Sequence, residues 1–338
     1  MSDNNQNKIN EFDISGQICV TNMQDVANEV MRLLAIAYPN QNFAALGQAF
    51  QDFELLYDGR YKRFRSCETL YHDKQHTLDM TLTMARILVS HHEASQPFEQ
   101  LGAARAELGL ITALFHDAGY IRHRNDWQHK NGAEYTQIHV TRSGNFLADY
   151  LPTIGRDNDV DVARILVHFT GYELDPRTLL TSDAKNRVMG YALGSADLIA
   201  QMADRCYLEK CLERLYPEFV VGGLAQIKQA DGSPLYHSKY DLIRKTPAFA
   251  EGECARRLDG IFGSIHEYMR NLFDGRNLYM ESIDIHVKHA KKISHSNDFS
   301  SLRRILPETA GTDDFPNLEN YLEGKESIEE KDDFKPYR

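Results

Sequence analysis

The sequence predicts an all-α protein, on two observations. Apolar residues recur at three- and four-residue spacing along most of the chain, which is the period of an amphipathic helix. Signals for strands are scarce, and only Ile18–Val20 and Phe219–Val221 are short candidates. The stretches that show the helical period lie near residues 23–37, 43–57, 76–92, 102–117, 131–150, 158–169, 187–215, 247–273 and 277–294.

Prolines and glycines divide these stretches. Pro152 follows the stretch 131–150 and Pro217 follows 187–215, so we expect each helix to end there. The glycine-rich segment 222–234 predicts a loop that leads into a pair of C-terminal helices.

The expected organisation is a single helical domain over residues 16–306. Its metal-binding core covers about 60–215, and a C-terminal helical extension covers 235–306. The ends predict a flexible tail over 1–15 and an acidic tail over 307–338.

The composition limits the classes of partner. The formal net charge is -11 and the chain has no long Lys/Arg block, which argues against binding of a nucleic-acid polymer or an anionic membrane. Five sparse cysteines predict reduced thiols rather than a disulfide framework. No apolar run approaches a signal core or a membrane span, so we expect a cytoplasmic protein. The amphipathic C-terminal helices allow a homodimer without requiring one.

Histidines and aspartates in successive helices indicate a metal site. His116 and Asp117 end an apolar run, where Gly119 is expected to close the helix with a left-handed turn. His72 and His76 are spaced four residues apart at the opening of a helix, which would place both on one face.

Three further donors follow in later helices. Each also has an explanation without metal: His139 could be a surface residue, His168 could be a core histidine, and Asp197 could pair with Arg205 or Lys210. Asp197, however, lies among small and apolar residues, where an unpaired acid is costly to bury. Together the donors predict bound divalent metal, and such a set accepts Mn, Fe, Mg, Zn, Co or Ni.

The order His76, His116-Asp117, Asp197 resembles that of the HD superfamily of metal-dependent phosphohydrolases, whose fold is a helical bundle. The segment Tyr71-His72-x3-His76-x2-Asp79-Met80 is also similar to the opening motif of the class I cyclic nucleotide phosphodiesterases. Tyr120 stands where the phosphodiesterase pattern has a later histidine, and Ile121 where the HD-GYP branch has proline. The resemblance covers about 60–215 and is that of a bacterial-type HD hydrolase.

The resemblance implies a binuclear centre. His76, His116, Asp117 and Asp197 would ligate the first ion, and Asp117 would bridge to a second ion held by His139 and His168. A metal-bound hydroxide would attack a phosphate ester, such as a nucleotide or cyclic nucleotide, while His72 protonates the leaving group. His72 and Asp117 are therefore the expected catalytic residues.

Other residues are candidates for binding the second ion or the substrate. His123 and His129 are alternatives to His139 as ligands. The basic loop around Trp127 offers Arg122, Arg124 and Lys130 for phosphate, and Gln201 lies one helical turn after Asp197, where it would face the substrate.

Two other classes of function share this donor order. One is a di-iron oxygenase of HD type, and the other is a non-catalytic regulatory module that binds metal or a nucleotide. A histidine at position 72 favours hydrolysis, because an oxygenase needs no proton donor there.

Overall fold

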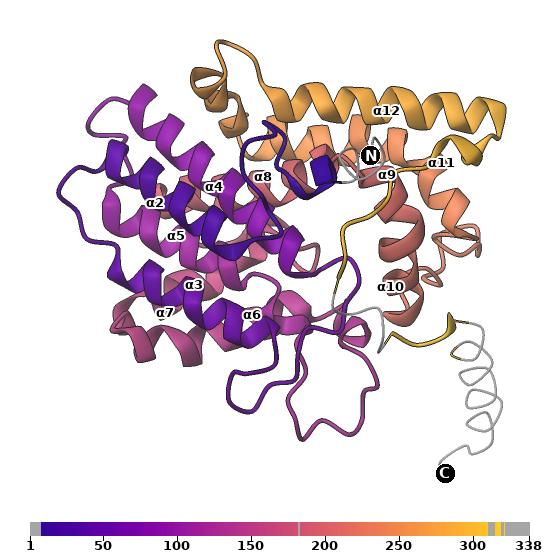
Figure 1. The fold of residues 1–338 in the computed structure, drawn as a ribbon, viewed down its shortest axis with the longest axis horizontal. Coiled ribbons are helices and arrows are strands. Elements are labelled where there is room, and N and C mark those ends of the chain that lie inside the picture. Colours follow the sequence, from indigo (N-terminus) through magenta and orange to yellow (C-terminus); the bar gives the residue numbers. More distant parts are fainter. Residues whose placement is uncertain (1–7, 182, 310–314, 319–320, 322–338) are drawn as a thin grey trace.

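The computed structural model describes residues 8–181, 183–309, 315–318 and 321, and it confirms the all-α prediction. Within these residues the chain forms α-helices joined by short 3-10 and π-helical segments, with isolated β-bridges and no strand (Figure 1). The α-helices are α2 (Met23–Ala37), α3 (Ala44–Tyr57), α4 (Lys74–Ala94), α5 (Ala103–Phe115), α6 (His139–Tyr150), α7 (Val160–Leu166), α8 (Ala184–Ala203), α9 (Tyr207–Lys210), α10 (Tyr216–Val221), α11 (Lys239–Phe249) and α12 (Leu278–Ser296).

Helix α4 lies at the centre of the fold and packs against α8, α2 and α5 (Figure 1). Every residue of α4 from Gln75 to His91 is buried. The Asp73 side chain caps the helix by accepting a hydrogen bond from the His76 backbone N–H, which fixes where the first turn begins. The first turn of α4 is therefore held in place from inside the protein.

Small residues on α8 let the segment that carries His168 approach closely. A Cβ on Gly190 would lie 2.5 Å from the Phe169 ring, and a Cβ on Gly194 would lie 2.6 Å from the Phe169 carbonyl oxygen. These contacts place the 3-10 turn Val167–Phe169 directly against α8. The turn consequently reaches the same part of α8 that carries Asp197.

The C-terminal helices α11 and α12 pack on each other, and α12 also packs on α8 (Figure 1). After α12 the chain returns across the body of the molecule. The Ile305 carbonyl accepts a hydrogen bond from the Asn10 side chain, and the Pro307 carbonyl accepts one from Arg214. Buried apolar residues from Val20 to Ile293 form one connected core.

The helix predicted over 187–215 is interrupted after Ala203, and the chain is helical again in α9 and in the π-helical segment Cys211–Leu215. Helix α8 ends at Ala203, because the Asp204 side chain accepts a hydrogen bond from the Cys206 backbone N–H and pairs with Lys210 at 2.5 Å. Pro217 does not stop a helix but sits in the first turn of α10, where its missing N–H costs nothing.

Two other boundaries also differ from the sequence prediction. The strand candidate Phe219–Val221 is helical and belongs to α10. The stretch 131–150 is divided into a 3-10 turn, Gly132–Tyr135, and α6, which begins only at His139. An Asn131–Glu134 capping box closes the 3-10 turn on itself, which accounts for the interruption.

The N-terminal segment is more ordered than a flexible tail over 1–15 predicts. Asp13 is 1 % exposed and pairs with Arg86 of α4 at 2.7 Å, so residues 8–15 belong to the packed structure. The second strand candidate, Ile18–Val20, makes only a single bridge between Phe12 and Cys19. Residues 1–7 and most of the predicted acidic tail 307–338 lie outside the described residues.

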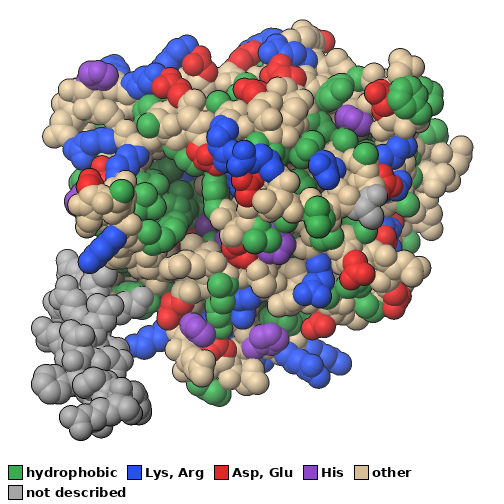
Figure 2. Space-filling view, turned by 180° about the vertical axis from the view of Figure 1, so that it is seen from behind, with side chains coloured by type: hydrophobic (Ala, Val, Ile, Leu, Met, Phe, Trp, Pro, Cys, Tyr) green, Lys and Arg blue, Asp and Glu red, His purple; other side chains and the backbone are tan. Residues whose placement is uncertain are grey.

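Charged side chains of both signs are interspersed over the face drawn in Figure 2, which also shows a hollow lined with hydrophobic side chains. Among the described residues, none of the helices combines the length and the apolar character needed to cross a lipid bilayer.

Asp79 of α4 makes the stability of the fold depend on pH. Burial and the nearby charges of Asp204 and Asp13 raise the pKa of Asp79 to about 8, although Arg86 and Lys210 oppose the rise. An acid whose pKa is higher in the folded state takes up a proton on folding, so its contribution is complete below pH ~4 and is lost as the pH rises towards 8.

We predict that Asp79→Asn, which stays neutral, becomes more stable relative to wild type as the pH rises from 5 to 8. Urea unfolding should show a relative gain of roughly 2–4 kcal/mol over that range. Asp284→Asn is the control, because Asp284 is an exposed partner of Lys288. Equal pH profiles for wild type and Asp79→Asn would contradict this account of Asp79.

Candidate metal centre

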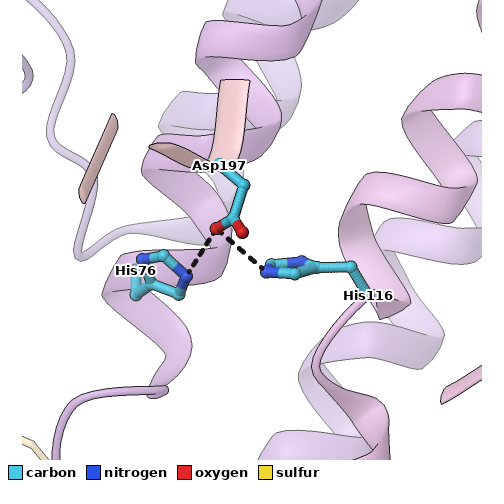
Figure 3. A group of neighbouring side chains, drawn as sticks. All are labelled: His76, His116 and Asp197. Atoms are coloured by element: carbon cyan, nitrogen blue, oxygen red, sulfur yellow. Dashed lines mark ion pairs between the residues drawn. The ribbon is translucent and has the colours of Figure 1, made fainter. Parts of the chain in front are cut away.

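Three helices bring His76, His116 and Asp197 together at one point (Figure 3). His76 comes from the first turn of α4, His116 from the C-terminal end of α5 and Asp197 from α8. Asp197 Oδ1 lies 3.3 Å from His76 Nε2 and 3.6 Å from His116 Nε2. The three ligand atoms lie within 4.8 Å of one another, so they could bind one metal ion together.

Asp117 lies on the other side of the two histidines. Its Oδ2 is 3.1 Å from His116 Nε2 and 3.5 Å from His76 Nε2, while its Oδ1 is 3.7 Å from His139 Nε2. One carboxylate thus faces both the three-residue group and a further imidazole. A role for Asp117 as a bridge between two ions stays a prediction.

The donor atoms are buried without the hydrogen bonds that buried polar atoms normally make. His116 Nε2 and Asp117 Oδ2 have no hydrogen-bond partner, although both residues are almost completely enclosed. Nitrogen and carboxylate oxygen donors of this kind suit divalent transition metals. The residues present therefore fit a bound cation.

The electrostatics of the cluster favour a positive charge at its centre. Burial alone would lower the pKa of His116, but the carboxylates of Asp117 and Asp197 raise it well above its ordinary value. The surrounding imidazoles hold the pKa values of Asp117 and Asp197 well below the ordinary range, against the effect of burial. Because ligands must be deprotonated to bind a metal, metal binding at this cluster would release protons.

Backbone carbonyls orient two of the imidazoles. His116 Nδ1 lies 2.8 Å from the Ala113 carbonyl oxygen, and His139 Nδ1 lies 2.6 Å from that of Thr136. A proton on Nδ1 satisfies each contact and leaves the Nε2 lone pair facing the cluster, which is the tautomer that ligates a metal. Burial, the largest effect on His139, lowers its pKa and favours that neutral form.

Gly119 does not adopt the left-handed conformation that the sequence suggested, and that prediction is wrong. It lies in a 3-10 turn, Ala118–Tyr120, and its φ is not among the positive values in the chain. Glycine is nevertheless required, because a Cβ there would lie 1.9 Å from the His139 carbonyl oxygen. The glycine thus allows α6, and with it His139, to approach Asp117.

The i, i+4 spacing suggested that His72 and His76 share a helix. In the structure His72 lies beside the cluster but precedes α4. The helix begins at Lys74, and the His72 and His76 rings are 5.7 Å apart between centroids. His72 Nδ1 is 2.5 Å from Glu218 Oε2 of α10, and the other Glu218 oxygen accepts from the backbone N–H groups of Tyr71 and His72. The fully buried Glu218 side chain thus fixes both the backbone and the ring at this position.

Tyr120 holds two of the imidazoles in place. Its ring stacks between His72, at a centroid distance of 4.5 Å, and His139, at 4.3 Å. Burial would lower the pKa of His72, but the negative charges of Glu218, Asp117 and Asp197 raise it to about 9. Tyr120 therefore fills the position where the phosphodiesterase pattern has a histidine.

His168 is placed less directly. It follows α7 in the 3-10 turn Val167–Phe169, and its Nδ1 lies 4.0 Å from Glu173 Oε2 and makes no hydrogen bond. Glu173 in turn accepts hydrogen bonds from the backbone N–H groups of Val140 and Thr141, directly after His139. A role for His168 as a ligand to a second ion stays a prediction.

In the basic loop around Trp127, Arg122 and Arg124 already donate hydrogen bonds to other parts of the protein. Each guanidinium nitrogen of Arg122 already donates, in a two-pronged pair with Glu68 at 2.6 and 2.7 Å and to the His129 carbonyl. Arg124 donates to the Gly59 carbonyl, and Lys130 is exposed. The structure thus gives Arg122 a structural role in place of the expected phosphate contact.

The remaining expected residues have other partners. His129 pairs with Asp126 at 3.1 Å, and His123 packs on Phe64. Neither therefore takes the place of His139. Gln201 lies on the turn of α8 after Asp197 and close to Tyr71, where it opposes the rise that burial causes in the pKa of the Tyr71 hydroxyl.

The sequence analysis missed Glu218, Tyr120 and Glu173. Glu218 lies 146 residues from His72 along the chain, directly before the strand candidate Phe219–Val221, so nothing local linked the two. Comparison with known protein families, with curated protein sequences and with solved structures finds no match to this chain.

We predict that Gly119→Ala destabilises the protein by about 2 kcal/mol or more, because the new methyl group overpacks a site where only backbone can move. Thermal unfolding followed by circular dichroism measures the effect. Gly252→Ala is the control, since a Cβ there meets nothing within 4 Å. An unchanged melting temperature for Gly119→Ala would contradict the close packing of α6 on this turn.

Metal content tests the ligand assignment. Asp117→Ala should remove nearly all bound metal, because Asp117 faces both groups of imidazoles, whereas His168→Ala should lower the occupancy of only one of about two ions. Elemental analysis of protein purified with added manganese measures both. His129→Ala, which removes a histidine paired with an aspartate outside the cluster, should leave the metal content unchanged. Equal losses in the Asp117 and His168 variants would contradict the two-ion arrangement.

Proposed function

We propose that this protein is a metal-dependent hydrolase of phosphate esters, with nucleotides or cyclic nucleotides as the expected substrates. The observation that carries the proposal is the pairing of two features at one place. A buried His/Asp donor cluster lies next to His72, a histidine outside the cluster that is fixed by a carboxylate. The first suits a cation and the second suits a proton donor.

The donor cluster would hold the cation through His76, His116, Asp117 and Asp197, with His139 and His168 available to a second ion. A bound divalent cation supplies Lewis-acid activation of water and neutralises charge on phosphoryl oxygens. The protein's own contribution is to fix the donors from three helices and to keep Asp117 and Asp197 ionised.

His72 is suited to hold a proton for the leaving group. Its Nδ1 faces Glu218, so Nε2 is the nitrogen left to face a substrate. The Glu218 carboxylate favours the imidazolium form, and Tyr120 limits rotation of the ring. A proton on Nε2 would pass to the ester oxygen as its bond to phosphorus breaks.

Glu218 acts through His72 and is a positioning residue. Its carboxylate accepts a hydrogen bond from His72 Nδ1, and it also accepts hydrogen bonds from the backbone N–H groups of Tyr71 and His72. The His72–Glu218 pair favours hydrolysis over the di-iron oxygenase and over the regulatory module, neither of which needs a held proton donor.

The first test combines metal analysis with turnover of bis(p-nitrophenyl) phosphate in the presence of manganese. About two equivalents of metal with turnover that a chelator abolishes would support the proposal. Bound iron that responds to dioxygen, without turnover, would favour the oxygenase. A protein that binds metal or nucleotide without any reaction would favour the regulatory module.

Leaving-group dependence tests the role of His72. We predict that His72→Ala lowers kcat about 10²–10⁴-fold for an alkyl phosphate ester, whose leaving alkoxide needs a proton. For a p-nitrophenyl ester the loss should be much smaller, because p-nitrophenolate leaves without protonation. Steady-state kinetics on both substrates measures the difference.

Glu218→Gln should show the same leaving-group dependence as His72→Ala, to a smaller degree and with unchanged metal content. Glu213→Gln is the matched control, because Glu213 is an exposed glutamate that precedes α10 and pairs with Lys239. Equal losses on both ester types would mean that His72 is not the proton donor.

A further inference from the structure

Arg257 is a buried cation with incomplete pairing. It is 2 % exposed and lies in the π-helical segment Arg256–Ile261. Its Nη2 donates to the Gly171 carbonyl at 2.6 Å, but Nε and Nη1 make no hydrogen bond. Buried guanidinium groups are normally satisfied on every nitrogen, because an unmet charged donor is costly.

The nearest carboxylate does not complete the pairing. Glu253 Oε1 is 3.4 Å from Arg257 Nε, but the same carboxylate forms a two-pronged pair with the exposed Arg256 at 2.7 and 2.8 Å. Aromatic rings fill most of the remaining surroundings, with the guanidinium 4.1 Å from the Tyr172 ring centroid and 6.0 Å from that of Phe262. The guanidinium therefore retains two donors and a positive charge for which the described residues provide no hydrogen-bonded anion.

The position of Arg257 adjoins the candidate metal centre. Its acceptor, Gly171, packs so closely on Val140 that a Cβ would lie 2.5 Å from a Val140 methyl group, and Val140 directly follows His139. Phe262 packs on Gly194, one turn before Asp197 on α8. Arg257 thus approaches the elements that carry His139 and Asp197.

Tyr172 covers Arg257. The guanidinium lies 4.1 Å from the Tyr172 ring centroid, and the residue is 59 % exposed, so its ring separates the guanidinium from solvent.

We propose that Arg257 binds an oxyanion of the substrate, a phosphoryl or carboxylate group that enters beneath the Tyr172 ring. With the reacting phosphate at the metal centre, the group bound by Arg257 would be a second anionic group of the same molecule. The substrate class is then a phosphate ester with two anionic groups, and that step rests on the proposed function. Charge-assisted hydrogen bonds from Nε and Nη1 would hold the anion.

Binding of inorganic phosphate to chelator-treated protein tests the site without any turnover. We expect calorimetry to show binding to wild type and about 10- to 100-fold weaker binding to Arg257→Gln, the effect of losing hydrogen bonds to a charged group. Arg276→Gln is the control, since it removes the same charge from an exposed arginine that pairs with Glu281. Equal binding by wild type and Arg257→Gln, or no binding by wild type, would overturn the proposal.

A fluorescent reporter covers the case in which Arg257→Gln does not fold. Tyr172 is exposed and Trp127 is the chain's only tryptophan, itself 83 % exposed, so Tyr172→Trp combined with Trp127→Phe places a single tryptophan over the guanidinium. Inorganic phosphate should change the emission of this variant at the concentration that saturates the calorimetric signal. An unchanged emission would overturn the proposal.

The same reporter separates this inference from the proposed function. Adding Asp197→Asn should lower the metal content and leave the phosphate response in place, because the anion binds at Arg257. If the reporter that retains Asp197 responds to phosphate while it hydrolyses no phosphate ester, the hydrolase proposal fails and the anion site stands. If turnover is present and the response is absent, the reverse holds.

Discussion

The burial of two carboxylates against imidazoles where α4, α5 and α8 meet is the constraint on which the rest of the structure depends. His76 and His116 lie between the carboxylates of Asp117 and Asp197, and removing the imidazoles would leave buried carboxylates without a partner. Three helices must therefore keep a fixed register relative to one another. The Asp73 side chain caps α4 and so sets where the helix starts. Because α4 packs on α8, α2 and α5, its position also fixes theirs.

Close backbone approach is the second requirement of the site. Gly119 lets the first turn of α6 lie against the turn that follows Asp117, and Gly171 lets the segment after His168 lie against Val140. Gly119 allows contact with the His139 backbone and Gly171 allows contact with the Val140 side chain, and neither glycine has a positive φ. The positions of His139 and His168 thus depend on glycines at 119 and 171, which have no side chain to hold the neighbouring segments apart.

Periodicity predicted most helices because burial of one face is a local property of the sequence. His76, His116 and Asp197 were identified by the order of donor residues along successive helices, and the structure brings these three together. Periodicity failed where a side chain competes with the helix, as Asp204 does after Ala203 and Asn131 before α6. It could not find Glu218, because a contact across 146 residues depends on how helices pack and leaves no mark near His72.

The residues after α8 supply what the donor cluster lacks. A cluster of imidazoles and carboxylates can hold a cation, but it offers neither a proton for a leaving group nor a cation for a second substrate charge. Glu218 of α10 orients His72, and Arg257 approaches the cluster from the π-helical segment that follows α11. Both residues lie after residue 215, whereas the candidate metal ligands His76, His116, Asp117 and Asp197 lie before it, so the two groups come from separate parts of the chain. Under the proposed function, substitutions after residue 215 should therefore alter hydrolysis while leaving metal binding intact.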